Sequence, residues 1–236
     1  MKGTLYGIGV GPGNPRLMTY LAVDTIKRCP VIAVPADGKG KAVAYKIASG
    51  IVEDLDAKEC LNLSTPMTKD KAILDAAYQT AADTIIEQLE QGKDVACLTL
   101  GDPTIYSTYI YIHRLVKAKG YETEIVNGIP SFCAAAAISK IPLTAWDEDL
   151  VIAPVRKNNA ADLEKLLTEH ENVVLMKPST DSEALVSAIQ ASGRENSFVL
   201  VEKAGTKEQR LIREYQTLKE EPVPYLSLMI LKSQKQ

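Results

Sequence analysis

The sequence predicts an α/β protein with two domains, the first built on a mostly parallel sheet and the second on a mixed sheet. The chain has 236 residues, which is enough for two modest domains that each bury an apolar core. Up to residue 126, short apolar runs alternate with amphipathic stretches, as in parallel sheets flanked by helices. Later strand-like runs lie closer together, which indicates mixed directions. We expect one domain over residues 1–122 and a second over 123–236.

Apolar runs and turn residues define the elements of the alternating pattern up to residue 126. The predicted strands are Leu5–Val10, Val31–Val34 ending at Pro35, a weaker Cys60–Leu63, Val95–Leu100 and Glu124–Val126. One helix is predicted to begin near Leu17. Three further helices are predicted at Val43–Ser49, at about Lys69–Gln91 and from Tyr109 to Gly120. Gly92 is placed to end the long helix, and Ser107 or Thr108 to cap the last one.

The pattern then changes, with a turn at Gly128–Ser131 and a small-residue helix over Phe132–Ile138. Further strands are predicted at Val151–Ala153, Val173–Met176, Phe198–Val201 and Tyr225–Leu231, with Arg210–Tyr215 as an additional strand candidate. Helices are predicted at Ala160–Glu169 and Asp181–Ala191. Only the tail, Lys232–Gln236, lacks a predicted place in a folded element.

Bulk composition argues against several classes of partner. The formal net charge is −3, from 27 basic and 30 acidic residues, and no basic stretch suits nucleic acid or an anionic membrane. No apolar run reaches the roughly 18 residues of a membrane helix, and no signal-peptide pattern precedes the first strand, so we expect a cytoplasmic protein. The four cysteines are too widely spaced for a zinc or redox motif, so we expect buried free thiols and no metal site.

A ligand loop is predicted at Gly101-Asp102-Pro103, directly after the apolar strand Val95–Leu100. Ligands of open α/β sheets bind outside the carboxyl ends of the strands. Gly101 leaves room for a ligand to approach the backbone, and Pro103 forces the chain out of the sheet.

The glycine-rich segment Gly7–Gly13 raises the alternative of a dinucleotide-binding enzyme. The spacing argues against it, because frames starting at Gly7 and Gly9 place Pro12 and Asn14 where the last glycine is required. Pro12 also lacks the N–H that would bind a phosphate oxygen. A phosphate-free nucleoside cofactor fits this loop better than NAD.

Four stretches together resemble the signature segments of the tetrapyrrole methylases. They are Gly7–Thr19, Gly101–Thr108, Gly128–Ala137 and Val201–Thr206, and they occur in the order and at the spacing of that family across nearly the whole chain. Within the family, the Tyr106-Ser107-Thr108-Tyr109 run and the later Ser-Phe-Cys-Ala segment resemble the C20-methyltransferases of cobalamin biosynthesis. These act on precorrin-2 or its cobalt complex, and the resemblance favours the cobalt form.

The resemblance implies two α/β domains with S-adenosylmethionine bound in a cleft between them and S-adenosylhomocysteine as product. Carried over by position, the cofactor-binding residues would be Pro12, Leu100, Gly101, Asp102, Ile105, Ser131, Phe132, Met176 and Ala204. Asp102 and Tyr106 are candidates for the base that removes the C20 proton. Lys177, Arg156, Lys157 and Lys203 are candidates for binding the carboxylates of the tetrapyrrole substrate.

The resemblance further implies a homodimer, and any cobalt would arrive within the substrate. Three alternatives stay open at this point. They are a metal-free precorrin-2 C20-methyltransferase or another tetrapyrrole methylase, a non-catalytic protein that binds the cofactor or a tetrapyrrole, and a nicotinamide-dependent enzyme.

Overall fold

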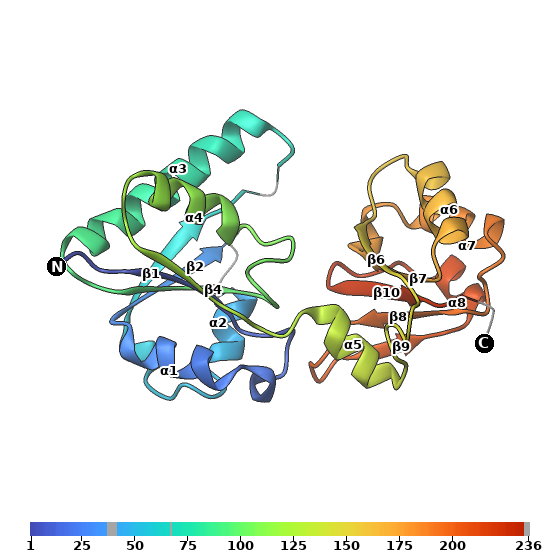
Figure 1. Cartoon of the computed structure of the whole chain (residues 1–236), viewed down its shortest axis with the longest axis horizontal. Coiled ribbons are helices and arrows are strands. Elements are labelled where there is room, and N and C mark those ends of the chain that lie inside the picture. Colours follow the sequence, from blue (N-terminus) through green and yellow to red (C-terminus); the bar gives the residue numbers. More distant parts are fainter. Residues whose placement is uncertain (37–41, 67, 234–236) are drawn as a thin grey trace. The chain divides into compact units, whose positions relative to one another are not determined.

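The computed structural model describes residues 1–36, 42–66 and 68–233, which form two compact units, Met1–Pro130 and Ser131–Gln236. Each unit is a sheet flanked by helices, so the predicted α/β class with two sheets is confirmed (Figure 1). The units divide after Pro130, later than the expected boundary between residues 122 and 123. The reason is that β5 (Thr123–Val126) pairs with β1 (Leu5–Gly9) and therefore belongs to the first sheet.

The first sheet contains five strands in the order β3-β2-β4-β1-β5, and all of their pairings are parallel. The remaining strands are β2 (Val31–Ala36), β3 (Glu59–Ser64) and β4 (Val95–Thr99). Every residue of β1 and β4 is buried, as expected for central strands of a parallel sheet. All five carboxyl ends therefore lie along one edge.

One predicted strand end was wrong, because β2 continues through Pro35 to Ala36 instead of ending at the proline. β4 pairs only with Val31–Ala33, so the carboxyl half of β2 has a strand on one side only. A proline is tolerated where a strand has a free side.

Helices cover both faces of the first sheet. α1 (Tyr20–Arg28) and α2 (Val43–Ala48) share one apolar core with it, while α3 (Lys71–Glu90) and α4 (Tyr109–Ala118) share the other (Figure 1). Short 3-10 turns occur at Pro15–Leu17 and Leu55–Ala57.

Local capping explains where two of these helices begin. α1 starts at Tyr20 rather than near Leu17 because the Thr19 hydroxyl accepts a hydrogen bond from the N–H of Ala22 at 3.1 Å. For α4, the Ser107 hydroxyl accepts from the N–H of Tyr109 at 3.2 Å, so Ser107, one of the two predicted capping residues, supplies this bond.

The second sheet has the order β6-β7-β10-β8-β9 and is mixed, as predicted. Its strands are β6 (Leu150–Pro154), β7 (Asn172–Met176), β8 (Phe198–Glu202), β9 (Arg210–Ile212) and β10 (Ser227–Leu231). β7 and β8 both run antiparallel to β10, which lies between them, so they share one direction and end at the same edge.

Helices α6 (Ala160–Glu169), α7 (Ser182–Ala191) and α8 (Tyr215–Glu220) form an apolar core with this sheet, and α5 (Ser131–Ser139) packs against β10 and β8. A 3-10 turn, Pro178–Thr180, follows β7. The candidate strand Arg210–Tyr215 is shorter than expected, since α8 begins at Tyr215, and β10 starts at Ser227 rather than Tyr225.

The expectation of buried thiols holds for Cys29 and Cys97 but was wrong for Cys60 and Cys133, which are exposed. Burial raises the pKa of both Cys29 and Cys97 to about 12. None of the helices in the described ranges combines the length and apolar composition needed to cross a bilayer.

Candidate functional site

The two predicted loops of the first unit are joined to each other where β1 and β4 end. The N–H of Gly11 donates to the carbonyl of Gly101 at 3.2 Å, and the N–H of Gly101 donates to the carbonyl of Gly11 at 2.8 Å. The glycine-rich loop and the Gly101-Asp102-Pro103 loop therefore form one structure. Pro12, Leu100 and Gly101 lie together in it, with Pro12 buried and Leu100 half-buried.

The main chains of three strand ends touch at Gly9, Gly101 and Gly128. A Cβ atom at Gly128 would lie 2.1 Å from the carbonyl oxygen of Gly101, and one at Gly9 would lie 2.5 Å from the nitrogen of Gly128. No side chain fits at either position without displacing the backbone. Gly9, the last residue of β1, thus allows close contact between strand ends.

The buried Asp102 carboxylate links the loops at this edge through hydrogen bonds. Its Oδ1 accepts hydrogen bonds from the Thr104 hydroxyl and from the Thr104 N–H at 2.8 Å. Its Oδ2 accepts from the N–H of Gly128 at 3.0 Å and from the Asn127 side-chain amide at 3.3 Å. The residue is 5% exposed. Asp102 therefore links the loop after β4 to the turn after β5.

Two opposing influences set the pKa of Asp102. Burial raises it, but the hydrogen bonds from Thr104, Gly128 and Asn127 together outweigh burial and hold the pKa below its ordinary value. An ionised, fully hydrogen-bonded carboxylate suits a positioning role better than proton transfer.

The network continues to the start of α1. The Thr19 hydroxyl donates to the carbonyl of Asn127 at 3.2 Å while it caps α1. The same turn that binds Asp102 is therefore fixed to a helix N-terminus. Asn127, Gly128, Thr104 and Thr19 were not among the predicted site residues, although the Asn-Gly pair after a strand is a recognisable turn signal.

Ile105 and Tyr106 follow in the same loop. Ile105 is half-buried, whereas Tyr106 is 49% exposed and has left-handed backbone, with φ of 48°. Ser107 next to it is held by a 2.8 Å hydrogen bond between its hydroxyl and that of Thr99. The structure thus gathers the six predicted residues of the first unit, from Pro12 to Tyr106, at one edge of the sheet.

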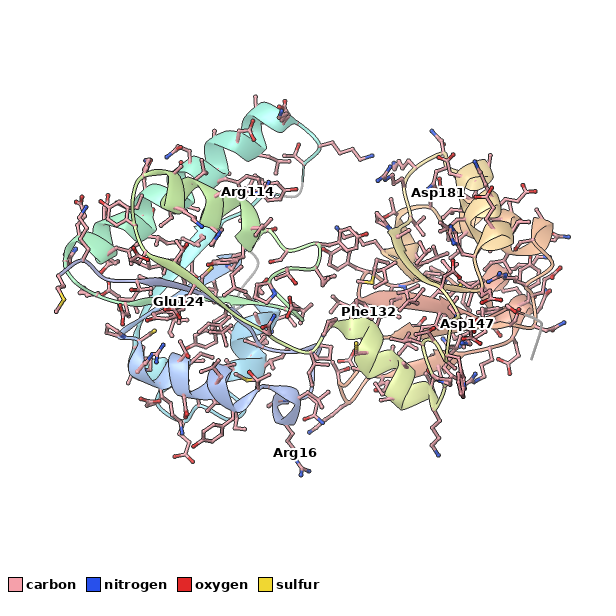
Figure 2. All side chains as sticks on the ribbon, viewed as in Figure 1. Arg16, Arg114, Glu124, Phe132, Asp147 and Asp181 are labelled. Carbon is pink, nitrogen blue, oxygen red and sulfur yellow. The ribbon has the colours of Figure 1, made fainter. Side chains whose placement is uncertain are left out.

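The remaining four predicted residues gather in the second unit. Met176 ends β7 and Ala204 follows β8, so both lie at the shared carboxyl edge of those strands. Ser131 and Phe132 begin α5, and Phe132 is buried (Figure 2). Arg213 after β9 donates to the carbonyl of Ser139 at 2.9 Å, which fixes the far end of α5 at the opposite edge of the sheet.

All four predicted carboxylate-binding residues also follow strands of this sheet. Arg156 and Lys157 come after β6, Lys177 after β7 and Lys203 after β8. Arg156, Lys157 and Lys177 are exposed, and Lys203 is half-buried. Among the described residues, no group of three or more histidine, cysteine, aspartate or glutamate side chains is arranged to hold a metal ion.

The sequence was compared with protein families and with known proteins. Residues 4–219 match the family model described as Tetrapyrrole (Corrin/Porphyrin) Methylases. A probable cobalt-precorrin-2 C(20)-methyltransferase from Methanocaldococcus jannaschii is 41% identical over 182 residues, which cover 77% of this chain and 75% of the relative. A precorrin-2 C(20)-methyltransferase from Sinorhizobium sp is 30% identical, with 97% of this chain and 95% of the relative covered.

A solved structure shows the same fold over nearly the full length. It is a uroporphyrin-III C-methyl transferase from Thermus thermophilus complexed with S-adenyl homocysteine, with a TM-score of 0.69, 20% identity, and coverage of 98% of this chain and 97% of that one. The match of the family model across most of the chain and the 41% identical relative agree with the four signature stretches. This chain belongs to the tetrapyrrole (corrin/porphyrin) methylase family.

Proposed function

We propose that this protein transfers a methyl group from S-adenosylmethionine to C20 of cobalt-precorrin-2 in cobalamin biosynthesis. The observation that carries the proposal is the 41% identity, over about three quarters of both chains, with a relative named for that reaction. Membership of the methylase family and the order of the four signature stretches support it.

The edge of the first sheet fits a nucleoside cofactor without phosphates. Its contacting strand ends are glycine main chain, and the Asp102 carboxylate beside them is engaged in hydrogen bonds within the protein. Pro12 has no N–H for a phosphate. A same-fold structure complexed with S-adenyl homocysteine supports the same conclusion, and with the family match it leaves the NAD alternative without support.

In this proposal the cofactor supplies an electrophilic methyl group on a sulfonium sulfur and leaves as S-adenosylhomocysteine. Pro12, Leu100, Gly101 and Ile105 would hold it from the first unit. From the second unit, we assign Ser131, Phe132, Met176 and Ala204 to the cofactor. Alignment of donor and acceptor alone can lower the barrier by roughly 7–11 kcal/mol, so no nucleophile from the protein is required.

Asp102 and Tyr106 take different roles in the proposal. Asp102 keeps the loop after β4 in register with the turn after β5, since both of its oxygens bind those segments. Tyr106 lies in the same loop and is 49% exposed. We assign to Tyr106 the transfer of the C20 proton toward solvent once the carbon has formed its bond to the methyl group.

The experiment is anaerobic incubation of the protein with cobalt-precorrin-2 and isotopically labelled S-adenosylmethionine, followed by mass spectrometry and NMR of the tetrapyrrole. We expect one added methyl group, bonded to C20. A methyl group at another carbon would contradict the C20 assignment. Binding of both ligands without transfer would instead support a non-catalytic protein.

The metal-free substrate is the second candidate, because the Sinorhizobium relative is named for precorrin-2. Equal concentrations of precorrin-2 and cobalt-precorrin-2 in one reaction test the preference. We expect the cobalt complex to be consumed first, and preferential methylation of the metal-free substrate would reverse the assignment.

We also propose that the protein is a cytoplasmic homodimer. The family resemblance supports the dimer, and four free cysteines suit a reducing compartment. Light scattering after size exclusion should give twice the chain mass, and fractionation of the producing cells should recover the protein with cytoplasmic markers. A chain-mass species, or recovery with membranes, would overturn the respective part.

A further inference from the structure

Two lysines with unusual backbone mark the ends of parallel strands in the second sheet. Lys177 directly follows β7 with φ of 56°, and Lys203 directly follows β8 with φ of 45°. Left-handed backbone is unfavourable for residues with a side chain and is found repeatedly at functional sites. At Lys177 the departure is greater, because the residue before a proline, here Pro178, favours extended backbone.

The positive φ of a third lysine, Lys140, has an ordinary local cause. Lys140 also has positive φ, 57°, but it follows the last turn of α5. Its N–H donates to Ala137, and the N–H of Ile141 donates to Ala136, as in a common helix ending. No helix ends at Lys177 or Lys203, so their conformation has no such explanation.

The two strand-end lysines lie on the same edge of the sheet. β7 and β8 run in one direction on either side of β10, so Lys177 and Lys203 flank the start of β10. Two strand spacings separate them, about 10 Å. Met176 and Ala204, both assigned to the cofactor above, are their direct neighbours in the chain.

The two lysines differ in whether their ammonium groups form ion pairs. The Lys203 ammonium forms an ion pair with Glu208. Lys177 is exposed, and its ammonium makes no hydrogen bond or ion pair within residues 1–36, 42–66 and 68–233. Within the described part of the chain, no acidic side chain pairs with the Lys177 ammonium at this edge.

A buried hydroxyl without a hydrogen-bond partner in the described residues, that of Ser227, lies next to Lys177 in register. Ser227 begins β10, and the pairing of Leu228 with Met176 places Ser227 beside Lys177 in register. Its hydroxyl is buried, with the residue 8% exposed, and it has no hydrogen-bond partner in the described parts of the chain. Buried hydroxyls are normally satisfied, so an unpaired polar atom lies in the same corner of the sheet as the Lys177 backbone.

We infer that Lys177 binds a carboxylate at the rim of the tetrapyrrole substrate and so positions its macrocycle. This rests on the proposed function, because precorrin-2 carries acetate and propionate groups around its rim. An exposed ammonium that has no acidic partner in the described ranges, on left-handed backbone at the end of β7, suits such an anion. S-adenosylmethionine also carries a carboxylate, so the experiment must separate the two ligands.

The test replaces Lys177 by glycine, which removes the charge and relieves the left-handed backbone. We expect K177G to raise KM for cobalt-precorrin-2 about tenfold, the size of one charged hydrogen bond. We expect kcat and the dissociation constant of S-adenosylhomocysteine to change less than twofold. The melting temperature should stay equal or rise, because glycine accepts this φ readily.

K140G is the matched control, since it removes an exposed lysine of the same backbone class at the end of α5. It should leave KM for the tetrapyrrole unchanged. K177R, which keeps the charge, should remain within threefold of wild type. Raising the salt concentration should weaken tetrapyrrole binding less in K177G than in wild type, because the screened charge is gone.

An unchanged tetrapyrrole KM in K177G, or an equal increase in K140G, would overturn the inference. Weakened S-adenosylhomocysteine binding would also overturn it and assign Lys177 to the cofactor carboxylate. The proposed function fails separately, when wild-type protein transfers no methyl group to C20. In that case, titration of wild type and K177G with cobalt-sirohydrochlorin still tests the carboxylate contact.

Discussion

The two sheets offer different chemistry at the edges where their parallel strands end. In the first unit, strand ends meet through main chain at Gly9, Gly101 and Gly128, and a buried carboxylate joins their loops. In the second unit, two strands end in lysines held in backbone that would suit glycine better. At the first edge the strand ends meet only because these positions have no side chain. At the second edge the backbone is strained at positions that do carry a side chain.

This difference bears on how a cofactor and a charged substrate are recognised. Glycine main chain allows a close approach to a ligand and adds no charge. An exposed ammonium selects an anion. We therefore expect changes at the first edge to affect stability and cofactor binding, and changes at the second edge to affect the tetrapyrrole selectively.

The largest effect should come from Gly128→Ala. The new Cβ would lie 2.1 Å from the Gly101 carbonyl, a clash with backbone that a side-chain rotation cannot relieve. We expect a loss of about 3 kcal/mol or more in unfolding free energy, together with loss of S-adenosylhomocysteine binding, measured by denaturant titration and calorimetry.

Gly120→Ala is the matched control for that change. Gly120, unlike Gly128, has a positive φ of 82°, and a Cβ there meets no atom within 4 Å. Only backbone strain of about 1 kcal/mol should result. Equal destabilisation by G120A and G128A would show that the three-strand contact is not tight.

The next effect should come from Asp102→Asn, which keeps the shape of the side chain. One of its two oxygens becomes an NH₂ group that faces donors from Thr104 or from Gly128 and Asn127. We expect a loss of about 1–3 kcal/mol and at least tenfold weaker S-adenosylhomocysteine binding by calorimetry. Unchanged cofactor affinity would remove Asp102 from the site.

The same carboxylate should give the protein a dependence on acid. The folded pKa of Asp102 is lowered, so its stabilising contribution is present above the unfolded pKa of about 3.9 and is lost as pH falls through the folded value. In melting experiments between pH 6 and pH 2, the stability gap between wild type and D102N should therefore narrow below about pH 4. A gap that stays constant would mean that folding does not lower the pKa of Asp102.

The smallest effect should be at Lys203, whose charge Glu208 already offsets. We expect K203G to change KM for cobalt-precorrin-2 less than threefold, well below the effect of K177G. Glu208→Gln should free the Lys203 ammonium and lower that KM. A larger effect of K203G than of K177G would reverse the roles inferred for the two lysines.

Much of the fold follows from local sequence pattern. The apolar runs predicted most of the strands, because a buried parallel strand needs a continuous apolar stretch. Asp70, Gly92 and Ser107 act at helix ends as their residue types suggest. The wrong predictions concerned features that depend on neighbouring strands. Pro35 stays in β2 because β4 does not pair with that part of the strand. β5 belongs to the first sheet because it pairs with β1.

The candidate site shows the same division. The sequence by itself determined the family and the positions of Gly101-Asp102, Met176 and Ala204 at strand ends, since these depend on residues close together in the chain. Only the tertiary structure decided that Gly128 must lack a side chain and that Asp102 binds a turn 26 residues away. It also decided that Lys203 pairs with Glu208, while Lys177 has no acidic partner among the described residues. Contacts between strand ends and hydrogen bonds over long sequence separations exist only once the sheets have formed, and no local pattern encodes them.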